Sequence, residues 1–241
     1  MSFPFEKMYA IKYQDDFFRN IKTIRNTQNL YDDLSDEPVD WESAHQLERN
    51  SKPKQYLSEP LINRPFEEAN FFNAIAFPFS TENWRASRYS DGSYGVWYGA
   101  IEFDTTIFET VHHWKKFLAA SNFDNHPLPI IGERRVFKVK CDALLYDFSD
   151  KIKEQPLLSH PNYYSLTQGI GEYLQNQGHP GLLSPSARCQ GKIAAIFKAK
   201  VLSDPRDYCY LRYRFEPKSQ ITEIERSPGQ VLFKVGDPSI K

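Results

Sequence analysis

Short apolar runs separated by turn residues make up most of the chain after residue 95, and they constrain the fold more than any other feature. In this part of the chain, two stretches, 106–120 and 163–177, repeat apolar residues at the spacing of a helix. Many strands with few helices between them predict an α+β fold whose sheet is mixed or mostly antiparallel. We expect strands over residues 95–101, 135–139, 143–148, 181–184, 191–201, 208–215, 221–224 and 231–235.

The first 58 residues differ from the rest because they are mostly polar and charged. Apolar residues recur near helical spacing over residues 15–30, which predicts an amphipathic helix, and a weaker helix is expected over residues 41–49. The composition changes at Glu59. We therefore expect an N-terminal helical extension, residues 1–58, that packs on a main domain of residues 59–241.

The charge and the histidine and cysteine patterns exclude several classes of function. With 30 basic and 31 acidic residues, the net charge is −1, which argues against direct nucleic-acid binding and against attraction to an anionic membrane. No apolar run approaches the ~20 residues that span a bilayer, and no secretory signal pattern begins the chain. The three cysteines form no CxxC pair and the six histidines form no H-x-H or H-E-x-x-H motif, so no metal site is expected. These observations predict a cytoplasmic protein with reduced thiols.

Arg88 and Glu109 are the charged residues most suited to a binding or catalytic site, and each has an ordinary alternative. Arg88 lies in a turn of Ser, Asp and Gly, where its fork can bind a phosphate or can simply pair with Asp91 on the surface. Glu109 follows Thr106 in a T-x-x-E pattern, so it either caps the helix or faces a cleft where it stabilises a developing cation.

Tyr98 and Ser186 are the polar candidates. Alternation along a strand sends Trp97 and Tyr98 to opposite faces, so one can stack on a planar ring while the other stays in the core. Ser186 has no G-x-S-x-G context and is no nucleophile by pattern, but with Arg188 it can hydrogen-bond a phosphate, or belong to a plain turn. A phosphate loop and G-x-G-x-x-G are both absent from the sequence, which argues against ATPase and Rossmann folds.

Three segments taken in order resemble the RES domain, a family named for its Arg, Glu and Ser. Residues 87–99 are similar to the family's arginine-containing turn and tyrosine-bearing strand. Residues 105–113 resemble the helix with the glutamate, and residues 181–188 resemble the P-S-x-R turn. The resemblance extends over about residues 60–201. It does not cover residues 1–55, and residues 84–87 replace the glycine-rich stretch that often precedes the family's second arginine.

This resemblance implies an ADP-ribosyltransferase-like fold that binds NAD as substrate, without a metal, in a cleft between two small sheets. Known members are toxins of bacterial toxin–antitoxin pairs. They cleave the nicotinamide–ribose bond by hydrolysis or phosphorolysis, or transfer ADP-ribose to a protein. Their antitoxin is typically a helix-turn-helix protein that blocks the cleft. A catalytically silent module that binds NAD or a partner is the remaining alternative.

The resemblance also implies roles for individual residues. Arg88, Glu109 and Ser186 are expected to be catalytic. Arg64, Tyr98, Arg88 and Ser186 are expected to bind NAD, with Arg64 as the counterpart of an arginine that the family carries on an early strand.

Overall fold

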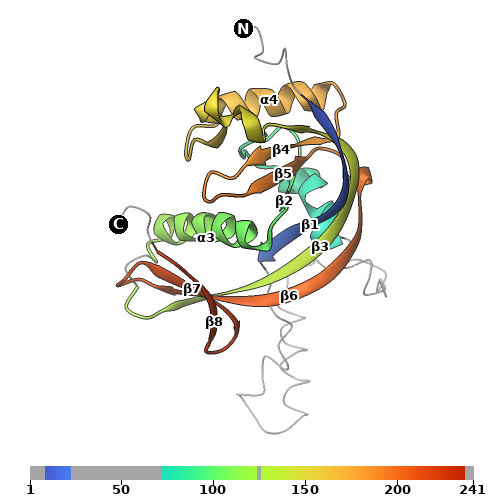
Figure 1. Ribbon diagram of the computed structural model, residues 1–241. Coiled ribbons are helices and arrows are strands. Elements are labelled where there is room, and N and C mark those ends of the chain that lie inside the picture. Colours follow the sequence, from blue (N-terminus) through green and yellow to red (C-terminus); the bar gives the residue numbers. More distant parts are fainter. Residues whose placement is uncertain (1–8, 23–71, 124–125, 237–241) are drawn as a thin grey trace.

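The computed structural model describes residues 9–22, 72–123 and 126–236 (Figure 1). The strands are β1 Ala10–Lys22, β2 Trp97–Ala100, β3 Ile130–Asp147, β4 Gly181–Pro185, β5 Lys192–Ile196, β6 Leu202–Glu216, β7 Ile221–Ser227 and β8 Gln230–Val235. The α-helices are α3 Phe103–Ala120 and α4 Ser165–Asn176, and short helical turns cover residues 72–83, 149–153, 156–159 and 199–201. The expected α+β class with a mixed sheet is confirmed.

The strands form one sheet that partly closes on itself. Their order is β1-β2-β5-β4-β3-β6-β7-β8, and β1 also pairs with β3 along its full length. The β3–β4 pairing is parallel and short, whereas the other pairings are antiparallel. Because β1 bridges β2 at Phe18 and Ala100, the strands β1, β2, β5, β4 and β3 complete a ring. The sheet therefore has two parts, β2-β5-β4 and β1-β3-β6-β7-β8, which meet at β3 and β1.

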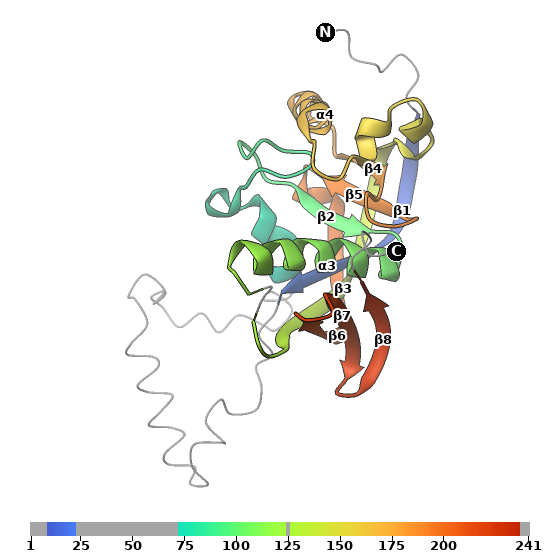
Figure 2. The same cartoon turned by 90° about the vertical axis from the view of Figure 1, so that its left-hand side faces the viewer.

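The two helices cover different parts of this sheet. Ile107 and Val111 of α3 pack on Val136, Leu211 and other residues of β3, β6 and β7. Both views show α3 between β2 on one side and β7–β8 on the other (Figures 1 and 2). Helix α4 buries Ile170 and Leu174 in a second cluster that includes residues of β4 and β5. The side of α3 opposite Ile107 and Val111 therefore lies next to β2 (Figures 1 and 2).

The N-terminal helix predicted over residues 15–30 is wrong where the structure describes it, because Ala10–Lys22 form strand β1. Both faces of β1 are covered from Phe17 to Ile21, whereas most residues before Asp16 are exposed. Phe17 stacks on Tyr13 and joins the core of the ring, while Phe18 contacts Phe103 on the other face. A strand covered on both faces need not alternate polar and apolar residues, so its pattern can imitate a helix. The expected helix over 41–49, Arg64 and the boundary at 58/59 lie outside the described residues.

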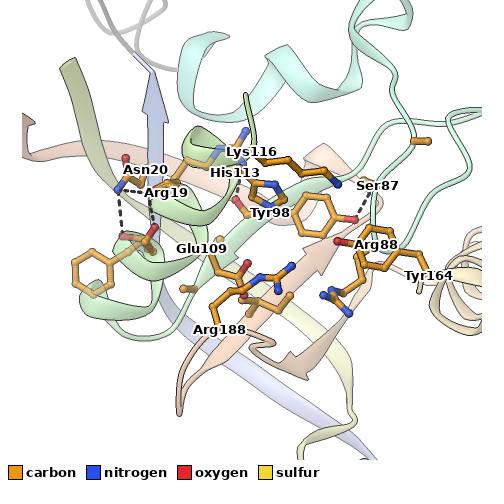
Figure 3. Close-up of a pocket in the computed structure, with 17 residues that line it drawn as sticks. Arg19, Asn20, Ser87, Arg88, Tyr98, Glu109, His113, Lys116, Tyr164 and Arg188 are labelled. Carbon is orange, nitrogen blue, oxygen red and sulfur yellow. Dashed lines mark hydrogen bonds between the residues drawn. The ribbon is translucent and has the colours of Figure 1, made fainter. Parts of the chain in front are cut away.

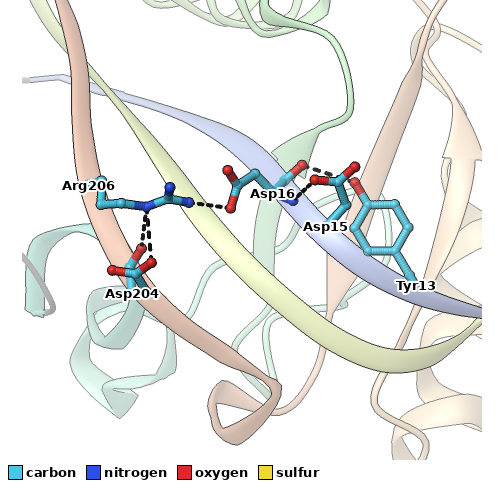
Figure 4. A network of polar contacts seen from close by, with 5 residues as sticks. All are labelled: Tyr13, Asp15, Asp16, Asp204 and Arg206. Carbon is cyan, nitrogen blue, oxygen red and sulfur yellow. Dashed lines mark hydrogen bonds and ion pairs between the residues drawn. The ribbon is translucent and has the colours of Figure 1, made fainter.

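Strand β3 is also longer than predicted. Residues 140–142 were expected to separate two strands, but they continue one strand, with Cys141 buried between exposed Lys140 and Asp142. Where the ladder with β6 is irregular near Lys138 and Lys140, Arg206 of β6 pairs with Asp16 of β1 and, at 3.1 Å, with Asp204 (Figure 4). This network links the two outer strands of the three-stranded segment β1-β3-β6. Within the described ranges, no helix is long and apolar enough to cross a membrane.

Candidate active site

A cavity of about 420 Å³ lies between α3, strand β1 and the part of the sheet that contains β2 and β5 (Figure 3). Strand β1 supplies Arg19 and Asn20 to its lining, and the turn before β2 supplies Ser87 and Arg88. The remaining polar lining residues are Tyr98 of β2, Glu109, Thr110, His113 and Lys116 of α3, Thr106 of the same helix, Tyr164 before α4, and Arg188 after β4. Segments far apart in the sequence thus meet at one site.

Glu109 lies in the second turn of α3 and faces this cavity. The expected T-x-x-E capping box is wrong, because the helix begins at Phe103 after Glu102, so Thr106 lies within its first turn. Instead, the Glu109 carboxylate accepts a hydrogen bond of 2.5 Å from the Ser186 hydroxyl. The Ser186 oxygen in turn accepts the Arg188 backbone N–H at 3.0 Å. Ser186 therefore orients the carboxylate of Glu109, and the capping alternative no longer explains this glutamate.

The loop that carries Ser186 is held tightly against the start of α3. The Ser186 N–H donates to the Gly191 carbonyl at 2.8 Å. A Cβ atom at Gly191 would lie 2.0 Å from the Thr105 hydroxyl oxygen and 3.0 Å from the Glu102 carboxylate. Only glycine fits at this position, and the close contact places Ser186 within reach of Glu109.

Tyr98 lines the cavity, whereas Trp97 is buried in the core, as strand alternation predicts. The Tyr98 hydroxyl accepts the backbone N–H of Tyr89 at 2.9 Å and is 2.8 Å from the Ser87 hydroxyl. Burial raises the pKa of Tyr98 to about 12, so its hydroxyl stays protonated. The hydroxyl holds both ends of the turn that contains Arg88, which leaves the ring as part of the cavity wall.

Arg88 is 8% exposed and points inward rather than pairing with Asp91 on the surface. Its Nη1 donates to the carbonyls of Leu158 at 3.2 Å and His160 at 3.1 Å, and its guanidinium lies 4.7 Å from the centre of the Tyr164 ring. Asp91 instead accepts hydrogen bonds from Ser93. The surface-pair alternative for Arg88 is therefore wrong.

Arg19 is a lining residue that the sequence reading missed. Its Nη1 donates to the Tyr98 carbonyl at 2.5 Å, and its guanidinium lies 5.4 Å from the Trp97 ring centre. Burial lowers the pKa of Arg19 to about 10, an effect that Tyr98 partly offsets. A charge inside the apolar run of Phe17, Phe18 and Ile21 was the available signal, but an amphipathic helix over residues 15–30 gave this charge no special role. Arg19 lies on an early strand, where the resemblance led us to expect an arginine, although the prediction named Arg64.

The described lining residues carry four permanent cationic side chains, Arg19, Arg88, Lys116 and Arg188, and one carboxylate, Glu109. Burial, followed by the positive charge of Arg188, lowers the pKa of His112 to about 4. The pKa of His113 is lowered by burial too, even though Glu109 acts in the opposite direction. Among the described residues, no cluster of three or more His, Cys, Asp or Glu is placed to hold a metal. The cavity therefore suits an anionic ligand with one cationic centre beside Glu109.

Comparison with known proteins adds a family assignment. A family model described as the RES domain matches residues 61–216. No curated protein matches the chain. Three chains of solved structures match, among them one from the crystal structure of the M. tuberculosis MbcT-MbcA toxin–antitoxin complex. That chain is 11% identical, the alignment covers 87% of this chain and 88% of that one, and the TM-score is 0.44.

Proposed function

The chain belongs to the RES domain family, and we propose that it is an NAD-consuming enzyme that cleaves the nicotinamide–ribose bond and acts as the toxin of a toxin–antitoxin pair. One observation carries this proposal. Glu109, oriented by Ser186, faces a cavity whose other described charged residues are cationic. NAD combines the matching features, a diphosphate that needs cations and a ribose that becomes cationic as its bond to nicotinamide breaks.

Glu109 is proposed to stabilise the developing charge. As the bond from the ribose C1′ to the pyridinium nitrogen breaks, its electron pair goes to that nitrogen and nicotinamide leaves as a neutral molecule. The ribose then has oxocarbenium character, and a nearby carboxylate lowers its free energy. The Ser186 hydroxyl keeps the carboxylate in place, because its own oxygen is fixed by the Arg188 N–H.

The other residues are proposed to bind the dinucleotide. Arg88 and Ser186 would contact the diphosphate or ribose, and the Tyr98 ring would face the nicotinamide. Arg19 reaches the same cavity and is proposed to add to the binding of the diphosphate. The assignment of Arg64 to NAD binding stays a prediction from the sequence. No metal is required by this scheme, since Glu109 and the arginines supply the charges.

The acceptor of ADP-ribose is proposed to be water or inorganic phosphate. When the acceptor oxygen bonds to the ribose carbon that released nicotinamide, water yields ADP-ribose and a proton, and phosphate yields ADP-ribose with a phosphate on that same carbon. The cationic lining of the cavity favours an anionic acceptor over a basic protein side chain. Transfer to a specific protein is the alternative activity, and a silent NAD-binding module is the alternative without turnover.

Nicotinamide release from NAD by the purified protein, with and without phosphate, tests the proposal. Release only with phosphate identifies phosphorolysis, and release in both conditions identifies hydrolysis. Absence of release while NAD still binds would favour the silent module, unless ADP-ribose appears on a protein supplied from a lysate. In a cell, the proposal predicts growth arrest through loss of cytoplasmic NAD. Co-expression with a helix-turn-helix antitoxin should relieve this arrest.

A further inference from the structure

Arg88 and Arg188 approach each other at one wall of the cavity from distant parts of the chain. Arg88 belongs to the turn before β2, and Arg188 follows β4 by three residues. Both side chains line the cavity, and their guanidinium groups lie at the same wall in Figure 3. Like charges at one wall repel each other, so other groups have to stabilise this arrangement.

One short segment, residues 158–161, anchors both arginines. Arg88 donates to the carbonyls of Leu158 and His160 at 3.2 and 3.1 Å, and Arg188 Nη2 donates to the carbonyl of Pro161 at 2.8 Å. His160 and Pro161 are neighbours in the chain, with Cα atoms about 3.8 Å apart. The anchoring segment therefore sets the distance between the two guanidinium groups.

These anchors leave the positive charges without a counter-ion. Among the described residues, neither arginine has a carboxylate partner within ion-pair distance. The Nε of Arg188 is buried and makes no hydrogen bond to a described residue. A backbone carbonyl orients a guanidinium but carries no net charge, so two guanidinium groups held in this way lack an anion between them.

We infer that Arg88 and Arg188 form a two-guanidinium clamp for one phosphate group, with the anchoring segment as its frame. The planar fork of arginine matches the oxygens of a phosphate, and each arginine is already fixed by its carbonyl contacts before the ligand binds. This inference rests in part on the proposed function, which names two sources of the phosphate group. It is either the diphosphate of the dinucleotide or free inorganic phosphate that acts as acceptor.

Calorimetric titration with ADP-ribose and with inorganic phosphate separates these sources. ADP-ribose carries the diphosphate and has no nicotinamide bond to cleave. Arg188→Gln should weaken binding of one probe by about 10- to 100-fold, the loss expected for a charge-assisted contact. Arg188→Lys keeps the charge without the fork and should recover only part of this loss. Arg85→Gln is the matched control, because Arg85 is exposed three residues before Arg88 and does not line the cavity.

The outcomes separate the clamp from the proposed function. Loss of ADP-ribose binding assigns the clamp to the diphosphate, and loss of phosphate binding alone assigns it to the acceptor. Unchanged binding of both probes in Arg188→Gln overturns the clamp even if the wild type cleaves NAD. If Arg188→Lys binds the probe as tightly as the wild type, a second planar guanidinium is not needed, and the two-guanidinium clamp is overturned. If the wild type binds ADP-ribose through Arg188 but releases no nicotinamide, the clamp stands and the proposed function fails.

Discussion

Replacing Gly191 by alanine should disable the site from outside the cavity. The added Cβ would lie 2.0 Å from the Thr105 hydroxyl oxygen, whereas ordinary contact begins near 3.4 Å, so the loop must retreat by more than about 1 Å. Gly191 is joined to Ser186 by a backbone hydrogen bond, so the retreat moves Ser186 away from Glu109. We expect kcat for NAD cleavage to fall by about 10²-fold, since a displacement of this size has that effect on positioned groups. The overpacking should lower the free energy of unfolding by about 1–3 kcal/mol.

The assay pairs nicotinamide release with thermal unfolding, and Gly169→Ala is its control. Gly169 lies in α4, and a Cβ there would meet no atom within 4 Å. That variant should keep wild-type kcat and a Tm at or above that of the wild type, because alanine favours a helix over glycine. If Gly191→Ala is folded and as active as Gly169→Ala, Ser186 does not position Glu109 and the reasoning fails.

Two further predictions concern Tyr98 and His112. Tyr98→Phe keeps the ring but removes the hydroxyl that binds Ser87 and the Tyr89 N–H. The free energy of unfolding should therefore fall by about 1–2 kcal/mol. Because the turn with Arg88 is then held less firmly, KM for NAD should rise by a larger factor than kcat falls. Equal kcat, KM and Tm in the two proteins would show that the hydroxyl does not hold the turn. His112 has its pKa lowered to about 4, mainly by burial. Below pH 6.5 the unfolded chain therefore binds a proton that the folded chain does not, and stability should fall between pH 6.5 and 4. Tm measured across this range should fall less in His112→Gln, and a parallel fall in both proteins would contradict the assignment.

The segments of the candidate site could be predicted because their order and joint presence resemble one family, although each local pattern also has an ordinary alternative. The expected apolar stripe of α3 is buried at Ile107, Val111 and Leu118, and Trp114 of the same stripe is half-buried. Arg88, Tyr98 and Glu109 line one cavity, with Ser186 bonded to Glu109, although they come from three separate segments. Local spacing identified these segments, and the family resemblance indicated that they meet.

What could not be predicted depends on contacts between distant segments. The pattern of β1 fits a helix until its second face is known to be covered by Phe103 and Tyr208, which lie far along the chain. Because β1 was predicted as a helix, Arg19 was not recognised as a residue of the candidate site. The start of α3 was placed three residues late because Thr106 and Glu109 match a capping box, and nothing local shows that Glu109 has Ser186 as its partner.

The most direct test of the central claim compares wild type and Glu109→Gln in nicotinamide release from NAD, with NAD affinity measured in parallel. Glutamine retains an oxygen that can accept the Ser186 hydrogen bond but lacks the negative charge that a ribosyl cation requires. The account predicts a fall in kcat of about 10²- to 10³-fold, with NAD affinity and Tm close to those of the wild type. Nicotinamide release at the wild-type rate by Glu109→Gln would contradict it.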